Sequence, residues 1–309
     1  MSYPAVILAA GRGSRMGNLG TQVQKALLPV GDEPIIGHHL HMLRSIGVEQ
    51  VHVVVGHRSS DVEAFVGDGT AYGLRVTYVV QSTQLGIAHA VAQLRSKLCG
   101  PFLLLLGDYF FIADEPRRMI QRLDEGVSAI LAKQEPDAGL IVQSCELRLG
   151  AGNLVSCLVE KPVRPAGNLK GCGLYALQPE IFDYISRTPR TCLRDEYELT
   201  VSLDMFARDG HPLRAEVMPV WDHNLTYPMD VLVCNMEWLE RHRETRFFAA
   251  SASVDPSAEL VNVVVGPQAR IGSGARLNNV VVFPRARVAA RACIENALAT
   301  TMGVVAVGR

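Results

Sequence analysis

Apolar residues in the C-terminal part of the chain follow a spacing that few folds accommodate. They recur every five or six residues, at Val254, Leu260, Val265, Ile271, Leu277, Val282, Val288 and Ile294. This period matches neither an α-helix nor an ordinary strand. It is typical of a β-helix, in which each turn has three short sides and one apolar residue per side points inward. We therefore predict a short left-handed β-helix over residues 251–309, after a first domain over residues 1–250. The alternative is an irregular β tail.

A β-helix of about two and a half turns cannot bury both of its ends alone. We therefore expect this tail to pack on the first domain or on a partner chain, and the chain to form a homo-oligomer.

The first domain alternates short β-rich runs with helical patterns. Continuous apolar runs predict strands that are covered on both faces, at 5–10, 51–55, 75–80 and 102–106. Less regular strand-like runs follow at 128–133, 140–147, 154–162 and 173–177. Helical patterns lie at 34–46, 61–66, 87–96, 179–186, 197–208 and 228–249. Such alternation predicts an α/β fold with a Rossmann-like, mostly parallel sheet. Ligands of these sheets bind beyond the carboxyl ends of the strands.

Composition excludes several classes of protein. The 309 residues are 48% hydrophobic and 20% charged, which is typical of a globular protein. The net charge of −1 argues against a nucleic-acid partner. The seven cysteines are scattered and form no C-x-x-C pair, so we expect reduced thiols, no zinc and a cytoplasmic setting. No apolar run reaches the ~18 residues of a membrane span, and we expect no membrane partner.

A glycine-rich loop follows the first strand. Gly11 and Gly13 let the backbone approach an anion closely, Arg15 can fork onto phosphate oxygens, and Lys25 adds a compact charge. The loop therefore predicts a polyphosphate site, although it is neither a P-loop nor a complete dinucleotide fingerprint. The alternative is a surface turn with two solvated cations.

Six segments in order resemble the sugar-1-phosphate nucleotidylyltransferases, the NDP-sugar pyrophosphorylases, and especially glucose-1-phosphate uridylyl- and thymidylyltransferases. The segments are "LAAGRGSRMG" with "KALLPVGDEPII", "QSTQLGIAHAV", "LLGDYFF", "LVEKP", "GCGLYAL" and "WDHNLTYPMDVLVCN". They span residues 5–235, and some members of the family carry a hexapeptide tail. The resemblance implies the nucleotidyltransferase fold and a Mg²⁺ cofactor.

The resemblance also implies roles for particular residues. It assigns the nucleotide to Leu8, Ala9, Ala10, Gly11, Gly13, Gln81 and Gly86. It assigns the sugar to Gly139, Glu160 and Gly173. It gives catalytic roles to Arg15, Lys25, Asp108 and Lys161, with Asp108 as a magnesium ligand.

The residues themselves are compatible with these roles. Asp108 follows a very apolar strand, so its carboxylate belongs at the ligand-binding edge, where one carboxylate can anchor Mg²⁺ beside substrate phosphates. Gln81 carries a donor and an acceptor on one planar group, which suits the edge of uracil or thymine. Glu160 and Lys161 could instead form an exposed ion pair, and the glycines could be simple turn residues.

The second metal ligand is either Asn224 or Asp222. The spacing back from "TYP" favours Asn224, whereas Asp222 is a charged competitor two residues earlier. Asp230 is expected to cap the following helix, and Asn235 to lie inside it.

Two features depart from the family or suggest other chemistry. The family usually has proline immediately before the loop lysine, where this chain has Gln24. The sequence therefore leaves undetermined how the loop closes. His38, His39 and His41 are expected to be packed or solvated on a helix rather than to bind metal, because only His38 and His41 share a face.

The predicted reaction transfers a nucleotidyl group from an NTP to a sugar 1-phosphate and releases pyrophosphate. UTP and dTTP are the favoured NTPs. The alternatives are a non-catalytic subunit that senses nucleotide sugars, a GTP- or CTP-using transferase with an unusual sugar or cyclitol phosphate, and a cytidylyltransferase acting on a non-sugar alcohol phosphate. The tail is expected to lack acyltransferase activity because no histidine follows His242.

Overall fold

The computed structural model describes residues 2–192 and 195–307. The chain divides into two compact units. Unit 1 contains Met1–Gly11 and His39–Asp222, and unit 2 contains Arg12–His38 and His223–Arg309. The chain therefore leaves unit 1 directly after its first strand and returns within a helix.

A parallel block of four strands forms one half of the sheet in unit 1. It contains β1 (Ala5–Ala9), β4 (Gln50–Val55), β5 (Arg75–Val80) and β6 (Phe102–Leu106). The order β6-β1-β4-β5 places Leu8 between Leu106 and Val54. These are the four strands that the apolar runs predict, and their carboxyl ends share one edge of the sheet.

The other half of the sheet is largely antiparallel. It contains β8 (Ser128–Gln134), β9 (Cys145–Leu149), β10 (Val155–Glu160), β11 (Leu169–Leu177) and β12 (Leu213–Val217). Strand β11 pairs antiparallel with β6, β8 and β9, and β12 pairs parallel with β8. A separate two-stranded sheet joins β7 (Tyr109–Ala113) to β13 (Val220–Asn224).

The predicted strand over 140–147 is wrong in its first part. Helix α6 (Ala138–Val142) occupies this position, because the Asp137 side chain caps it by accepting a hydrogen bond from Gly139 N at 2.7 Å. The sequence "LIV" at 140–142 favours a strand, but the cap places these residues in a helix. Strand β9 begins only at Cys145.

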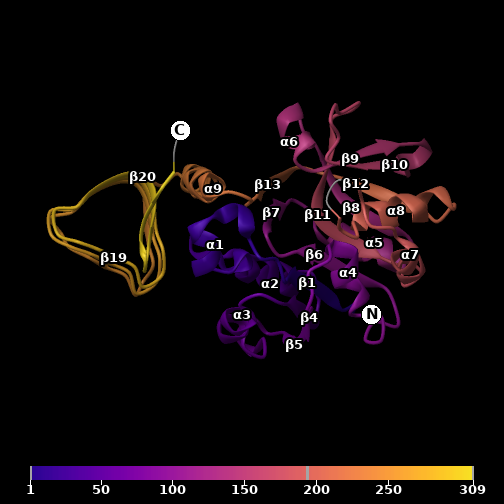
Figure 1. Cartoon of the computed structure of the whole chain (residues 1–309), viewed down its shortest axis with the longest axis horizontal. Helices are drawn as coiled ribbons and strands as arrows, with labels where there is room; N and C mark the ends of the chain where they lie inside the picture. Colours follow the sequence, from indigo (N-terminus) through magenta and orange to yellow (C-terminus); the bar gives the residue numbers. More distant parts are fainter. Residues whose placement is uncertain (1, 193–194, 308–309) are drawn as a thin grey trace. The chain divides into compact units, whose positions relative to one another are not determined.

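Helices cover the sheet of unit 1 (Figure 1). They are α2 (Ile35–Ser45), which crosses between the units, α3 (Ser59–Val66), α4 (Ile87–Ala92), α5 (Arg117–Asp124), α7 (Ile181–Arg187) and α8 (Leu199–Arg208). Ala88, Ile181 and Leu203 from three of them pack in one core with Phe102 and Leu104 of the central strand. The predicted helices therefore exist, with ends that differ by a few residues.

The histidines of α2 differ in exposure, since His39 is buried, His38 is partly buried and His41 is exposed. His38 Nε2 lies 2.8 Å from Val30 O, His39 packs against Phe111, and His41 meets the edge of Tyr72. Among the described residues, no group of three or more His, Cys, Asp and Glu could hold a metal ion.

The C-terminal strands of unit 2 stack in parallel. Long sides come from β14 (Arg246–Phe248), β16 (Glu259–Val265), β18 (Arg276–Val282) and β20 (Cys293–Thr300), and short sides from β15 (Ser253–Val254), β17 (Arg270–Ile271) and β19 (Arg287–Val288). Figure 1 draws these coils in yellow as a stack with a triangular outline. Strand β21 (Gly303–Ala306) closes one end of the long-side sheet by pairing antiparallel with β20.

The predicted inward positions lie directly above one another. Val254 pairs with Ile271, which pairs with Val288, and Leu260 and Leu277 stack in the same way. Pairs such as Leu260 and Leu277 are 17 residues apart in the chain, so three sides together contain 17 residues. The five-or-six-residue spacing in the sequence is this coil length divided by three.

Helix α9 (Pro228–Arg241) is shorter than the predicted 228–249. Arg243 takes a positive φ of 57° after the helix, and residues 246–248 form β14 instead. Phe247 packs against Trp238 of α9 with ring centroids 5.3 Å apart. The charged residues up to Arg241 are helical, but Arg243 and Glu244 lie beyond the helix, and the following aromatic residues belong to the first coil. In the part of the chain that the structure describes, no helix is long and apolar enough to cross a bilayer.

Candidate active site

The end of β6 in unit 1 positions Asp108. Gly107 N donates a hydrogen bond to Leu8 O at 2.9 Å, and a Cβ on Gly107 would lie only 2.5 Å from that oxygen. Glycine is therefore required here, because it lets the chain pass close to the neighbouring strand. The next residue, Asp108, lies partly buried beyond the carboxyl end of the strand, as the sequence predicts.

The predicted nucleotide segment Leu8–Ala9–Ala10 lies at the same edge. Ala9 and Ala10 are buried, and Leu8 is partly buried. Gly11 is exposed, and a Cβ there would meet nothing within 4 Å. The backbone at Gly11 is therefore open on the side where a side chain would stand.

The glycine-rich loop of unit 2 folds back on itself. Gly13 has a φ of 65° and begins the 3₁₀ turn η1 (Ser14–Met16), which contains the exposed Arg15. Helix α1 (Asn18–Gln22) follows, and a Cβ on Gly20 would lie 2.4 Å from Gly13 O. The Lys25 stem also packs on Gly13, 3.2 Å from where a Cβ would be. Close packing of backbone and lysine stem thus explains both glycines.

Gln24 takes the backbone geometry that proline would take. Its φ is −69°, and Val23 before it is extended at φ −133° and ψ 132°. The Gln24 side chain also accepts a hydrogen bond from Ala26 N, which caps the turn η2 (Lys25–Leu27). Lys25 is only 7% exposed. The backbone at Gln24 thus has a φ that proline could also take, and the glutamine adds a cap.

Gln81 follows β5 and is buried. Its Nε2 lies 2.8 Å from His89 Nδ1 and 3.5 Å from Gly86 O. Gly86 has a φ of 112° and is clamped, because a Cβ would lie 2.5 Å from Tyr197 O. Tyr197 also donates its N–H to Leu85 O and accepts from Ala88 N. The segment "QSTQLGIAHAV", which contains Gln81 and Gly86, is therefore held by the backbone of Tyr197, far along the chain.

The three residues assigned to the sugar and the neighbouring catalytic candidate Lys161 have different surroundings. Lys161 has a φ of 46°, and its Nζ lies 3.9 Å from Glu160 Oε1, with a quarter of each side chain exposed. Gly139 lies exposed in the first turn of α6. Gly173 has a φ of 65° and makes room for the Tyr109 ring, which a Cβ would approach to 2.9 Å. Their roles toward a sugar stay predictions, and Gly173 also has this structural reason.

Asp222 belongs to a buried cluster of charges that sequence reasoning missed. Its carboxylate lies 2.5 Å from Lys133 Nζ and 2.8 Å from Lys170 Nζ, and it accepts a hydrogen bond from Tyr109. Glu135 completes the cluster, 3.0 Å from Lys133. Burial alone would raise the pKa of Asp222, but Lys170, Lys133 and Tyr109 hold it below its ordinary value. The oxygens of Asp222 are therefore already used by protein groups.

Asn224 has different surroundings. It is exposed at the end of β13, and its Oδ1 accepts a hydrogen bond from Thr226 at 3.2 Å. Asp230 caps α9 as predicted, accepting from Thr226 N and Tyr227 N, and Asn235 lies buried inside that helix.

The nucleotidyl transferase family model matches residues 4–222, more than two thirds of the chain. This chain belongs to the nucleotidyl transferase family. It is similar to the low-salt glycan biosynthesis nucleotidyltransferase Agl11 of Haloferax volcanii, with 29% identity covering 82% of this chain and 72% of the relative. It is also similar to the UTP–glucose-1-phosphate uridylyltransferase AglF of that organism, with 30% identity covering 73% of this chain and 92% of the relative.

The fold of the transferase has solved counterparts. A UDP-glucose pyrophosphorylase complexed with UDP-glucose matches with a TM-score of 0.69 at 19% identity, covering 78% of this chain and all of that one. The likeness supports a mixed α/β nucleotidyltransferase-type fold, and the central sheet of this chain combines the parallel block with the antiparallel half.

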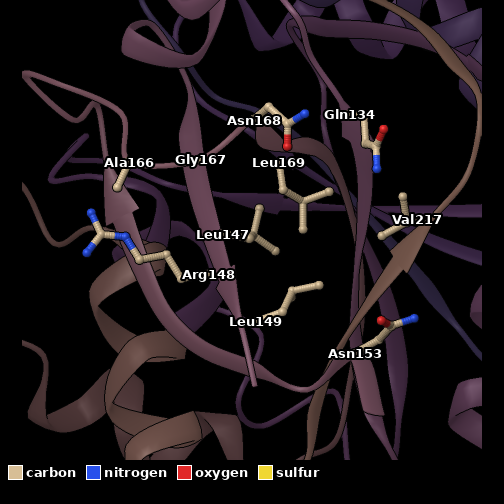
Figure 2. Close-up of a pocket in the computed structure, with 10 residues that line it drawn as sticks. All are labelled: Gln134, Leu147, Arg148, Leu149, Asn153, Ala166, Gly167, Asn168, Leu169 and Val217. Atoms are coloured by element: carbon tan, nitrogen blue, oxygen red, sulfur yellow. The ribbon is translucent and has the colours of Figure 1, made fainter. Parts of the chain in front are cut away.

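A shallow hollow of about 500 Å³ in unit 1 of the transferase contains none of the predicted site residues. Figure 2 shows Leu147, Leu149, Leu169 and Val217 turned toward this space, whereas Arg148 points to the other side of its strand. Near it, the buried Glu146 accepts hydrogen bonds from Ala166 N and Gly167 N, both at 2.8 Å. Residues 166–168 of the loop that follows Lys161 therefore form part of the wall of the hollow.

The residues that sequence reasoning missed carried weak signals. Lys133 and Lys170 are cations within otherwise apolar strands, which is unusual unless they are paired. His89 stands eight residues after Gln81 in the recognised segment, and nothing in the spacing says that the two side chains touch.

Proposed function

We propose that the chain transfers a nucleotidyl group from an NTP to a sugar 1-phosphate and releases pyrophosphate. The observation that carries the proposal is the placement of Asp108 at the carboxyl end of β6, beside the strand that leads into the Gly11–Gly13 loop. Family membership and the similarity to a UTP–glucose-1-phosphate uridylyltransferase support it. UTP and dTTP are the favoured donors.

The reaction needs charge neutralisation more than proton transfer. A phosphate oxygen of the sugar phosphate attacks the α-phosphorus in line, and pyrophosphate leaves with the bonding electrons. The attacking oxygen is already anionic, so no general base is required. Arg15 and Lys25 neutralise the triphosphate, and Lys161 neutralises the sugar phosphate. Leu8, Ala9, Ala10, Gly11, Gly13, Gln81 and Gly86 hold the nucleotide, and Gly139, Glu160 and Gly173 hold the sugar.

The residues fit Mg²⁺ as the metal. Magnesium favours one or two carboxylate or carbonyl oxygens completed by substrate phosphates. Asp108 supplies a carboxylate and Asn224 an amide oxygen, whereas Asp222 is committed to its two lysines. When bound, the ion would supply positive charge to the triphosphate.

The C-terminal coils are proposed to form a left-handed β-helix that defines a domain over residues 251–309 and supports a homo-oligomer in the cytoplasm. The repeating 17-residue register and the buried, stacked pairs Leu260–Leu277 and Val265–Val282 support a β-helix.

A pyrophosphate-release screen tests the function. It crosses five NTPs with glucose-, N-acetylglucosamine-, mannose- and galactose-1-phosphate, with and without Mg²⁺. We expect magnesium-dependent release with one pair, and a drop in kcat of about 10²–10³ in Lys25→Ala or Asp108→Ala. The exposed Lys97→Ala is the control for a lost lysine. Wild-type turnover in either site variant would contradict the assigned roles, and silence of a folded, nucleotide-binding protein would favour the sensing alternative.

A further inference from the structure

Among the described residues, the hydrogen-bond contacts of the Gln81 side-chain amide all involve its Nε2 atom. Its Nε2 lies 2.8 Å from His89 Nδ1, and Gly86 O lies on the same side at 3.5 Å. A carbonyl oxygen can only accept hydrogen bonds, so it favours the amide NH₂ of Gln81 on that side. His89 then accepts through Nδ1 and carries its proton on Nε2. The Gln81 Oε1 atom is left on the opposite side as an acceptor.

His89 is itself held in place. It lies on α4, whose first turn is fixed by the hydrogen bonds between Tyr197 and the segment around Gly86. The His89 ring stacks over the Tyr197 ring, with centroids 6.4 Å apart and an interplanar angle of 25°. Gln93 Nε2 donates to His89 O at 3.0 Å and also lies 3.4 Å from His89 Nε2. The bond to the backbone oxygen is the shorter of the two, and it holds the Gln93 amide when His89 Nε2 carries the proton. The ring therefore offers Nδ1 at a fixed position.

We infer that His89 is a positioning residue for nucleotide recognition, which fixes the Gln81 amide so that its oxygen, and not its nitrogen, meets the base. The inference rests on the proposed function, in which Gln81 reads the base. His89 itself need not touch the nucleotide. The contacts that carry it all lie within unit 1.

The orientation of this amide selects between bases that have the same shape. Uracil and thymine present an N3–H donor, which an amide oxygen accepts. Cytosine presents a lone pair at N3, which an amide oxygen repels. A glutamine amide that is free to rotate could present its oxygen to uracil or its NH₂ to cytosine. An amide that is held in one orientation favours only one of these bases. His89 thus converts a glutamine that could serve both pyrimidines into one that prefers uracil or thymine.

The test compares UTP with CTP in His89→Leu and His89→Asn. Leucine keeps the bulk of the ring but offers no acceptor. We expect the ratio of kcat/KM for UTP over CTP to fall about threefold to tenfold, the effect of one hydrogen bond. The change should appear in KM, with kcat for UTP nearly unchanged. Asparagine can place its Oδ1 near the position of Nδ1, and it should restore most of the ratio.

Two further measurements separate positioning from damage to the fold. Calorimetric titration with UTP alone and with CTP alone should show the same loss of discrimination without any turnover. His41→Leu makes the same substitution on the exposed face of α2 and should change neither ratio nor KM. A preference of the wild type for CTP, or an unchanged ratio in His89→Leu, would overturn the inference.

Failure of the inference is distinguishable from failure of the proposed function. If wild-type protein forms no nucleotide sugar and binds no NTP, the function itself is wrong. If it turns over UTP with clear discrimination and His89→Leu keeps that discrimination, only the role of His89 is wrong.

Discussion

Gln24 shows how one residue can replace another through backbone geometry. The family resemblance implies proline before the loop lysine, and the φ of −69° at Gln24 is close to the value proline imposes. Glutamine reaches this value freely and adds a hydrogen bond from Ala26 N. The loop around Lys25 is therefore specified by a conformation that two different residues can adopt.

We predict that Gln24→Pro retains the fold and most of the activity. The lost cap costs about 1 kcal/mol, and the reduced freedom of the unfolded chain returns about 0.4–1 kcal/mol. Thermal unfolding and kcat/KM should both stay near wild type, whereas Gln24→Gly should lower stability. A tenfold loss of kcat/KM in the proline variant would show that the loop needs the glutamine side chain.

Asp222 and Asn224 are two residues apart and should respond oppositely to substitution. Asp222→Asn leaves the buried Lys170 and the partly buried Lys133 without their shared carboxylate, so we expect a loss of about 3–5 kcal/mol in the free energy of unfolding. Asn224→Ala should leave stability unchanged and raise the Mg²⁺ concentration needed for half-maximal rate. Asp183→Asn, which breaks an exposed pair with Arg95, is the control and should cost less than about 1 kcal/mol. Equal magnesium requirements for wild type and Asn224→Ala would remove Asn224 from the metal site.

At the scale of elements, a buried carboxylate holds the loop after the predicted sugar-binding segment. Burial alone would raise the pKa of Glu146, but Arg148 and the N–H groups of Ala166 and Gly167 hold it below its ordinary value. A lowered folded pKa means that the ionised form is stabilised by folding. This contribution is complete above the unfolded pKa of about 4.3, and it is lost as the pH falls through the lower folded value.

We therefore predict a pH-dependent effect of Glu146→Gln. The variant keeps an acceptor for the two N–H groups but loses the charge, so it should be about 1 kcal/mol less stable at pH 7. The difference from wild type should shrink between about pH 5 and pH 3, measured by urea unfolding at each pH. Glu180→Gln, at an exposed position, should show no such convergence. A difference that stays constant down to pH 3 would contradict the assignment.

The coil stack depends on its inward row. Leu277 is 2% exposed and lies between Leu260 and Ile294 in the parallel register. Leu277→Ala should destabilise the coils by about 2–5 kcal/mol, followed by circular dichroism during thermal unfolding. Val261→Ala, on the outer face of the same sheet at 55% exposure, should change stability by less than about 0.5 kcal/mol. Similar effects of the two substitutions would contradict the inward assignment.

At the scale of the whole molecule, the sequence predicts what depends on local periods. The parallel strands and the coil length follow from runs such as 102–106 and from the spacing of Leu260 and Leu277, because these patterns record which face is buried. Asp108 is also predictable, since a carboxylate after such a strand lies at the ligand edge.

Contacts between distant segments could not be predicted. Asn235 donates to Pro29 O and accepts from Gly31 N, about two hundred residues away in the chain. Tyr197 holds Gly86, and Lys170 pairs with Asp222, in the same non-local way. No period or spacing encodes such pairs, because each depends on how the completed fold brings chain segments together. The extension of α9 was wrong for a related reason: the aromatic residues after it pair with a later strand.

The central claim is that a sugar phosphate oxygen attacks the α-phosphorus of an NTP. Mass spectrometry of the products made from UTP and a sugar 1-phosphate labelled with ¹⁸O in its phosphate oxygens tests it most directly. We predict that the label, including the new bridging oxygen, stays in the nucleotide sugar, and that the released pyrophosphate contains none. Label in the pyrophosphate, or formation of pyrophosphate without a nucleotide sugar, would contradict the account.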